Sequence, residues 1–105
     1  MKILIKLALT SLIGVTVMSI TATADVAKGQ KIYSKTVKPQ CNNMTGSNFA
    51  GKHTQDQWEE IYDAGKLGDE ISKICGGFKL NEKLHPHLYD FAYEYANDSG
   101  NVPSC

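Results

Sequence analysis

The chain of 105 residues contains no arginine, and this absence restricts the partners that it can bind. Without a guanidinium fork, bidentate recognition of phosphate or carboxylate groups is ruled out. The 11 lysines and 11 acidic residues balance to a net charge of zero, so no basic excess favours nucleic acid. We therefore expect a protein that does not bind nucleic acid.

The sequence also lacks a nucleophile–base pair, a phosphate-binding loop and a Cys-x-x-Cys motif. Several of its acidic residues, such as Glu59-Glu60 and Asp69-Glu70, occur in short clusters, which is typical of solvated helix faces. Because no catalytic constellation can be assembled from these residues, we do not expect an enzyme.

Long apolar runs are absent except at the N-terminus, where the pattern is typical of a secretory signal. Lys2 and Lys6 provide a positive start, residues 7–20 are largely apolar, and residues 22–24 match a small-x-small cleavage site. The apolar stretch is short for a membrane span, which needs about 20 apolar residues, so cleavage is favoured over an uncleaved anchor. We expect a signal peptide over residues 1–24, a periplasmic or secreted location, and no stable membrane anchor.

The expected mature domain, residues 25–105, is small for a self-sufficient hydrophobic core. Nine of the lysines remain in it against all 11 acidic residues, which gives a net charge of −2. It also contains all three cysteines, Cys41, Cys75 and Cys105. Because export leads to oxidising conditions, we expect one disulfide, with the pairing open and one thiol left over.

No alternating strand pattern occurs, so the predicted fold class is all-α. The first helix is expected over residues 26–38, with Asp25 as N-cap and Pro39 ending it. A loop is expected over residues 41–52, with Phe49-Ala50 tucked inward.

Three more helices are predicted along the rest of the chain. One starts at a Thr54–Gln57 capping box and stops at Gly65, and a short one covers residues 69–75. The last has Pro86 at its first position and an apolar stripe, followed by a polar tail over residues 97–105. The stripe consists of Leu84, Leu88, Phe91, Ala92 and Tyr95.

Three of these segments share features with one family. Residues 27–33 carry Gly29 and an aromatic shortly before a cysteine, residues 54–61 are followed by Gly65, and the last helix ends at Tyr95-Ala96. In this order they resemble a small monohaem cytochrome c of the soluble bacterial type. The resemblance implies a cytochrome-c-like bundle of three to four short helices, in which Gly29 lets an aromatic of the last helix pack closely.

The haem-attachment motif of that family, Cys-x-x-Cys-His, is degenerate in this sequence. Cys41 matches the first thiol, whereas Met44 replaces the second and Thr45 replaces the histidine ligand. A thioether cannot add to a haem vinyl group, and a hydroxyl is a poor iron ligand. The resemblance therefore implies a domain that has lost haem and acts in binding or structure. The alternative is a periplasmic electron carrier that holds haem c atypically, through His53 or the His85/His87 pair.

The resemblance also bears on the cysteines. Cys75 lies roughly where the family has its distal ligand, so a Cys41–Cys75 disulfide would bridge the former haem site. The pairings of Cys105 with Cys41 or Cys75 remain open. With Cys41 and Cys75 paired, Cys105 is a free thiol for a covalent dimer or a mixed disulfide with another exported protein, unless it instead fastens the tail to the body.

Two further patterns have an ordinary and a functional interpretation. His85-Pro86-His87 offers two imidazoles that suit copper or zinc, but a closed site needs four ligands, so metal delivery is the weaker hypothesis. The five tyrosines serve core packing or a binding surface. They are Tyr33, Tyr62, Tyr89, Tyr93 and Tyr95.

Overall fold

The computed structural model describes residues 26–105, and this part of the chain is helical without any strand. The predicted all-α class is confirmed. The predicted signal peptide, residues 1–24, lies outside the described residues. Within residues 26–105, no helix combines the length and the apolar character that crossing a membrane requires.

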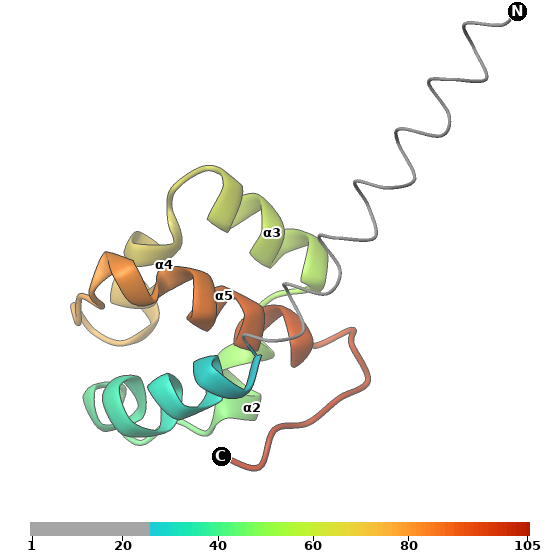
Figure 1. The fold of residues 1–105 in the computed structure, drawn as a ribbon, viewed down its shortest axis with the longest axis horizontal. Helices are drawn as coiled ribbons and strands as arrows, with labels where there is room; N and C mark the ends of the chain where they lie inside the picture. Colours follow the sequence, from blue (N-terminus) through green and yellow to red (C-terminus); the bar gives the residue numbers. More distant parts are fainter. Residues whose placement is uncertain (1–25) are drawn as a thin grey trace, which may run out of the picture.

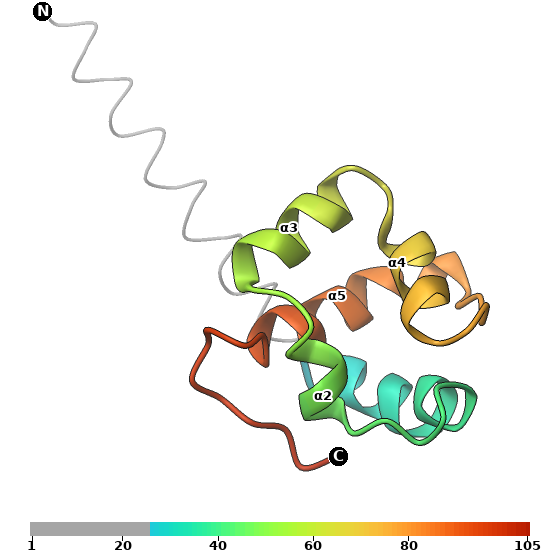
Figure 2. The ribbon, with the colours of Figure 1, turned by 180° about the vertical axis from the view of Figure 1, so that it is seen from behind.

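Helix α5 (His85–Glu94) lies at the centre of the arrangement in Figures 1 and 2. It runs between α3 (Gln55–Asp63) on one side and the N-terminal helical segment, residues 26–40, on the other. Helix α4 (Leu67–Ile74) packs across the start of α5, and α2 (Gly46–Ala50) packs against α5 beside the N-terminal segment. Helices α2, α3 and α4 therefore all pack on α5.

The N-terminal segment continues past the predicted stop at Pro39. Residues 26–32 are α-helical, and the chain then widens into the π-helical turn η1 (Tyr33–Val37) and tightens into the 3₁₀ turn η2 (Lys38–Gln40). Lys38 keeps helical geometry and donates its N–H to the Tyr33 carbonyl. The prediction that Pro39 ends the helix was wrong, because Pro39 lies in the first turn of η2, where no helical hydrogen bond requires its missing N–H.

The expected loop over residues 41–52 contains a short helix, α2, that the sequence pattern did not predict. Thr45 is its N-cap, since its hydroxyl accepts a hydrogen bond from the Asn48 N–H at 3.1 Å. Phe49 and Ala50 are fully buried, as expected from their position between two glycines. With α2 added, the described residues hold more helices than the three to four expected.

The capping box before α3 is confirmed in both directions. The Thr54 N–H donates to Gln57 Oε1 at 2.9 Å, and the Gln57 N–H donates to Thr54 Oγ1 at 3.2 Å. Gly65 follows α3 with a φ of 72°, the left-handed conformation that favours glycine at a helix stop. Helix α4 begins at Leu67, two residues before the prediction, and the turn η3 (Glu82–Leu84) precedes α5.

The polar tail, residues 97–105, lies against the body rather than extending from it. Pro103 is buried, the Gly46 N–H donates to the Cys105 carbonyl at 3.2 Å, and the Gln30 amide donates to the Ser104 hydroxyl at 2.8 Å. Figure 1 shows the tail turning back so that the C-terminus ends beside α2. The tail is therefore held by packing and hydrogen bonds.

Candidate functional site

The cysteines are divided into one disulfide and one free thiol. Cys41, at the end of the N-terminal segment, is bonded to Cys75, which follows α4, and their Cα atoms are 4.3 Å apart. Both are buried, with exposures of 1% and 6%. The expected disulfide is therefore present, and it joins the first helical segment to α4.

Cys105 is a half-buried free thiol. It lies close to α2, because a Cβ added to Gly46 would stand 2.8 Å from the Cys105 sulfur and 2.9 Å from the Phe91 ring. Non-covalent contacts, rather than a disulfide of Cys105, thus fasten the tail.

A continuous aromatic stack fills the interior between the N-terminal segment, α2, α3 and α5. The ring centroids of Tyr33 and Phe49 are 5.0 Å apart, those of Tyr33 and Phe91 are 5.3 Å apart, and those of Phe49 and Trp58 are 5.6 Å apart. All four side chains have zero exposure. Such offset contacts add to the energy of burial, so this stack is the main part of the core.

The polar atoms of this stack are satisfied by backbone carbonyls. The Tyr33 hydroxyl donates to the Met44 carbonyl at 2.6 Å, and Trp58 Nε1 donates to the Ala50 carbonyl at 2.8 Å. Burial, with a further contribution from Cys105, raises the pKa of Tyr33 to about 12. Tyr33 is therefore a neutral donor at physiological pH.

The three histidines have separate surroundings. His53 Nε2 is 2.7 Å from Glu70 Oε2 and its ring meets Trp58 edge-on, whereas His85 Nε2 is 3.1 Å from the Leu80 carbonyl. His85 and His87 are two positions apart on one helix and so do not face each other. Among residues 26–105, no three His, Cys, Asp or Glu side chains are placed to share a metal ion.

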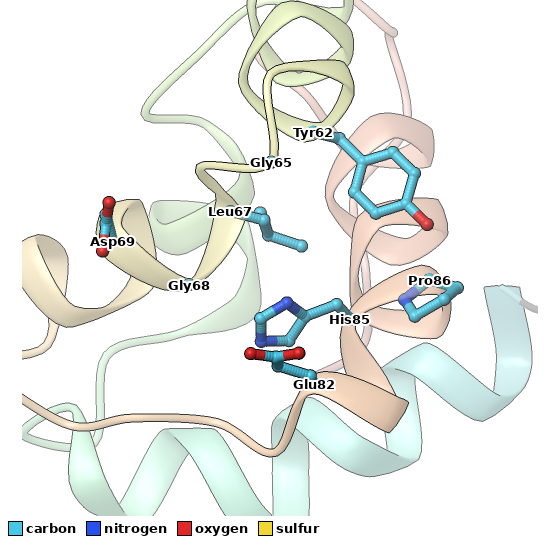
Figure 3. Close-up of a pocket in the computed structure, with 8 residues that line it drawn as sticks. All are labelled: Tyr62, Gly65, Leu67, Gly68, Asp69, Glu82, His85 and Pro86. Carbon is cyan, nitrogen blue, oxygen red and sulfur yellow. The ribbon is translucent and has the colours of Figure 1, made fainter.

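Two adjoining cavities of about 370 and 230 Å³ flank His85, between the start of α4 and the turn that leads into α5. They share Gly68, Asp69, Glu82 and His85, and we call them together the His85 groove. Figure 3 shows the larger part, where side chains from three helices and η3 surround one space. The larger part of the groove is lined by the side chains of Tyr62, Leu67, Asp69, Glu82, His85 and Pro86.

The orientation of the His85 ring in this groove follows from its hydrogen bond. A carbonyl oxygen can only accept, so Nε2 carries the proton that is shared with Leu80. In the neutral ring Nδ1 is then an acceptor, and Figure 3 shows Nδ1 on the side of the ring that faces Leu67. Gly68 gives the ring room, because a Cβ there would stand 3.1 Å from His85 Cε1.

A tyrosine ladder on α3 and α5 continues from the groove. Tyr62 stacks on Tyr89 with ring centroids 4.4 Å apart and an interplanar angle of 10°, and Tyr93 follows at 5.8 Å from Tyr89. Burial and the neighbouring carboxylates, Glu59 first among them, raise the pKa of Tyr89. All three rings are half-buried, whereas Tyr33 is fully buried in the core, so core packing is confirmed for Tyr33 and a tyrosine binding surface stays a prediction.

The sequence pattern identified His85 but not the groove around it. Asp69 was interpreted as an ordinary helix-face acid, and no sequence pattern singled out Glu82 or Leu67. The groove forms because η3 returns the chain to the start of α4, a contact over a long sequence separation that no local pattern reveals. Gly68, a glycine in the first turn of a helix, was the one available sign of a close approach.

No family model, curated protein or solved structure matches this chain.

Proposed function

We propose that this protein is an exported, cytochrome-c-like helical domain that has lost haem and acts as a disulfide-stapled binding or structural module. The observation that carries the proposal is the aromatic stack of Tyr33, Phe49, Trp58 and Phe91, which occupies the interior with zero exposed area. Close-packed interiors hold few voids larger than water, so a porphyrin would have to displace this stack.

The helix crossing at Gly29 supports the relation to the cytochrome scaffold. A Cβ at Gly29 would stand 2.1 Å from the His87 carbonyl oxygen and 2.9 Å from Phe91 Cβ. Only a glycine permits this approach between the first helical segment and α5. The resemblance implies the same kind of contact, between a glycine of the first helix and an aromatic of the last.

The residues at the positions of the haem motif do not fit haem, because each has another task. Cys41 is consumed in the disulfide, the Met44 carbonyl accepts from Tyr33, and the Thr45 hydroxyl caps α2. Protein packing and the disulfide therefore supply the cohesion for which the family uses its cofactor.

Export accounts for the disulfide, because disulfides persist in the periplasm and outside the cell. Cys105 is the free thiol in this proposal, and it offers a site for a mixed disulfide with an exported partner. The proposed role is thus binding rather than electron transfer.

The test is expression of the whole chain in cells that can attach haem to exported proteins, followed by purification without reductant. The proposal expects a colourless protein whose mass equals the processed chain less the two hydrogens lost in the disulfide. The matched control for the attachment machinery is the variant with Met44→Cys and Thr45→His, in which the motif that starts at Cys41 becomes Cys-x-x-Cys-His. A Soret band, or a mass increase equal to one haem, in the unaltered protein would contradict the proposal.

A further inference from the structure

We propose that the His85 groove binds an aliphatic primary ammonium group, of the kind carried by a lysine side chain or a small diamine. This inference rests on the binding role proposed above and names the ligand class for it. Three features of the groove point to this ligand: an apolar and aromatic wall, two carboxylates at its edges, and one oriented imidazole acceptor.

The wall suits an alkyl chain that ends in a cation. The exposed Pro86 presents apolar surface, the half-buried Tyr62 ring lines the same space, and the buried Leu67 closes its floor (Figure 3). The larger part of the groove, about 370 Å³, is within the usual range for small-ligand sites of about 300–1,000 Å³. A methylene chain would lie along Pro86, and a cation near the Tyr62 ring would gain from its electron-rich face.

The charged side chains that line the larger part of the groove are acidic. Asp69 comes from the first turn of α4 and Glu82 from the first turn of η3, so carboxylates enter from two separate elements. No lysine lines this part, and Lys79 lines only the smaller one. This arrangement attracts a cation and repels carboxylate or phosphate ligands, in agreement with the absence of arginine from the chain.

His85 adds a directional acceptor. Its Nε2 is held by the Leu80 carbonyl, which leaves Nδ1 as the acceptor of the neutral ring. An ammonium N–H can donate to this Nδ1. The charged and titratable groups around the ring are Asp69, Glu82, Tyr62 and, on the smaller side, Lys79.

The primary test is a titration of the purified, disulfide-linked protein, followed by NMR of its backbone amides. Putrescine and Nα-acetyl-lysine amide are the two ammonium probes, and pentan-1-ol is the uncharged control. Saturable shifts centred on Leu67, Gly68 and His85 with either ammonium probe are expected, and the tighter probe identifies the source as diamine or lysine side chain. Equal binding of pentan-1-ol, or no saturable shift with both amines, overturns the proposal.

Charge variants separate the groove from the general surface. Asp69→Asn and Glu82→Gln are each expected to weaken ammonium binding about two- to fivefold, the usual range for exposed charge pairs. Glu60→Gln, an exposed α3 carboxylate outside the groove, is the matched control and should leave binding unchanged. If the Asp69→Asn, Glu82→Gln double variant binds as the unaltered chain does, the proposal is wrong.

Gly68→Ala tests the geometry without changing charge. The new Cβ would stand 3.1 Å from His85 Cε1 and must push the ring, whereas alanine favours the helix. Ammonium binding is expected to fall while thermal stability does not fall in parallel. The absorbance spectrum of the same sample tests the loss of haem independently of the titration. A failed titration of a colourless protein therefore overturns the ligand class and leaves the loss of haem standing.

Discussion

The Cys41–Cys75 disulfide is expected to supply a large share of the stability of this domain. Its two cysteines are 34 positions apart, and closure of a loop of that length restricts the unfolded chain by about 4 kcal/mol. A domain of about 80 residues has a total unfolding free energy of about 4–12 kcal/mol. Replacing both cysteines by alanine should therefore lower the free energy of unfolding by about 3–4 kcal/mol and leave a marginal fold.

Alanine is the appropriate replacement because both positions are buried, at 1% and 6% exposure. A serine hydroxyl there would add a desolvation cost unrelated to the cross-link. Cys105→Ser is the matched control, since Cys105 is a half-buried free thiol. It should change the free energy of unfolding by about 1 kcal/mol or less, because no loop is opened.

Urea unfolding, followed by two probes, measures this difference. The single tryptophan, Trp58, is fully buried against Phe49, so its fluorescence reports the core, and circular dichroism reports the helices. Coincidence of the two transitions would justify a two-state free energy. Equal midpoints for the double-alanine variant and the unaltered chain, at unchanged slope, would refute the loop-entropy argument.

Peptide mapping checks the pairing itself. Trypsin, which cleaves after lysine but not before proline, should place Cys41 in fragment 36–52, Cys75 in fragment 74–79 and Cys105 in fragment 84–105. Without reductant, fragments 36–52 and 74–79 should appear as one linked species. A link between 84–105 and either of the others would show that the stabilising bridge is a different one.

Two further predictions concern the helix crossing and the buried phenol. Gly29→Ala should destabilise the fold by about 2 kcal/mol in urea, because backbone at His87 would have to shift and overpacking exceeds the gain of about 1 kcal/mol in helix propensity; a more stable variant would show that the helices do not meet there. The pKa of Tyr33 is raised from 10.0 to about 12, so its contribution is present below pH 10 and is lost as the pH rises through 12. The loss should approach 2–3 kcal/mol at about 1.36 kcal/mol per pH unit, and Tyr33→Phe should remove this part of the alkaline dependence of urea unfolding.

Local sequence patterns predicted those features whose physical cause is local. The Thr54–Gln57 capping box and the stop at Gly65 depend on hydrogen bonds and dihedral angles within a few residues, and both are present. The apolar spacing of the last helix also placed Leu88, Phe91 and Ala92 in the core correctly.

Local sequence patterns gave wrong predictions where tertiary contacts determine the backbone conformation. Pro39 was expected to end the first helix, but the 3₁₀ turn η2, which follows the π-helical turn η1, carries the chain past it while Tyr33 and Val37 remain buried. The short helix α2 was missed because five residues show little periodicity. Its burial of Phe49 against Tyr33 and Trp58 is what stabilises it.

The sequence by itself determined an arginine-free, all-helical chain with one thiol to spare, because composition, helical periodicity and cysteine count are properties of the linear chain. Only the tertiary structure decided that Cys41 pairs with Cys75, since three thiols allow three single bridges and proximity selects among them. It also decided that Asp69, Glu82 and His85 share one groove. Residues so far apart meet only after the chain has folded back on α5, and long-range packing rather than local preference sets that path.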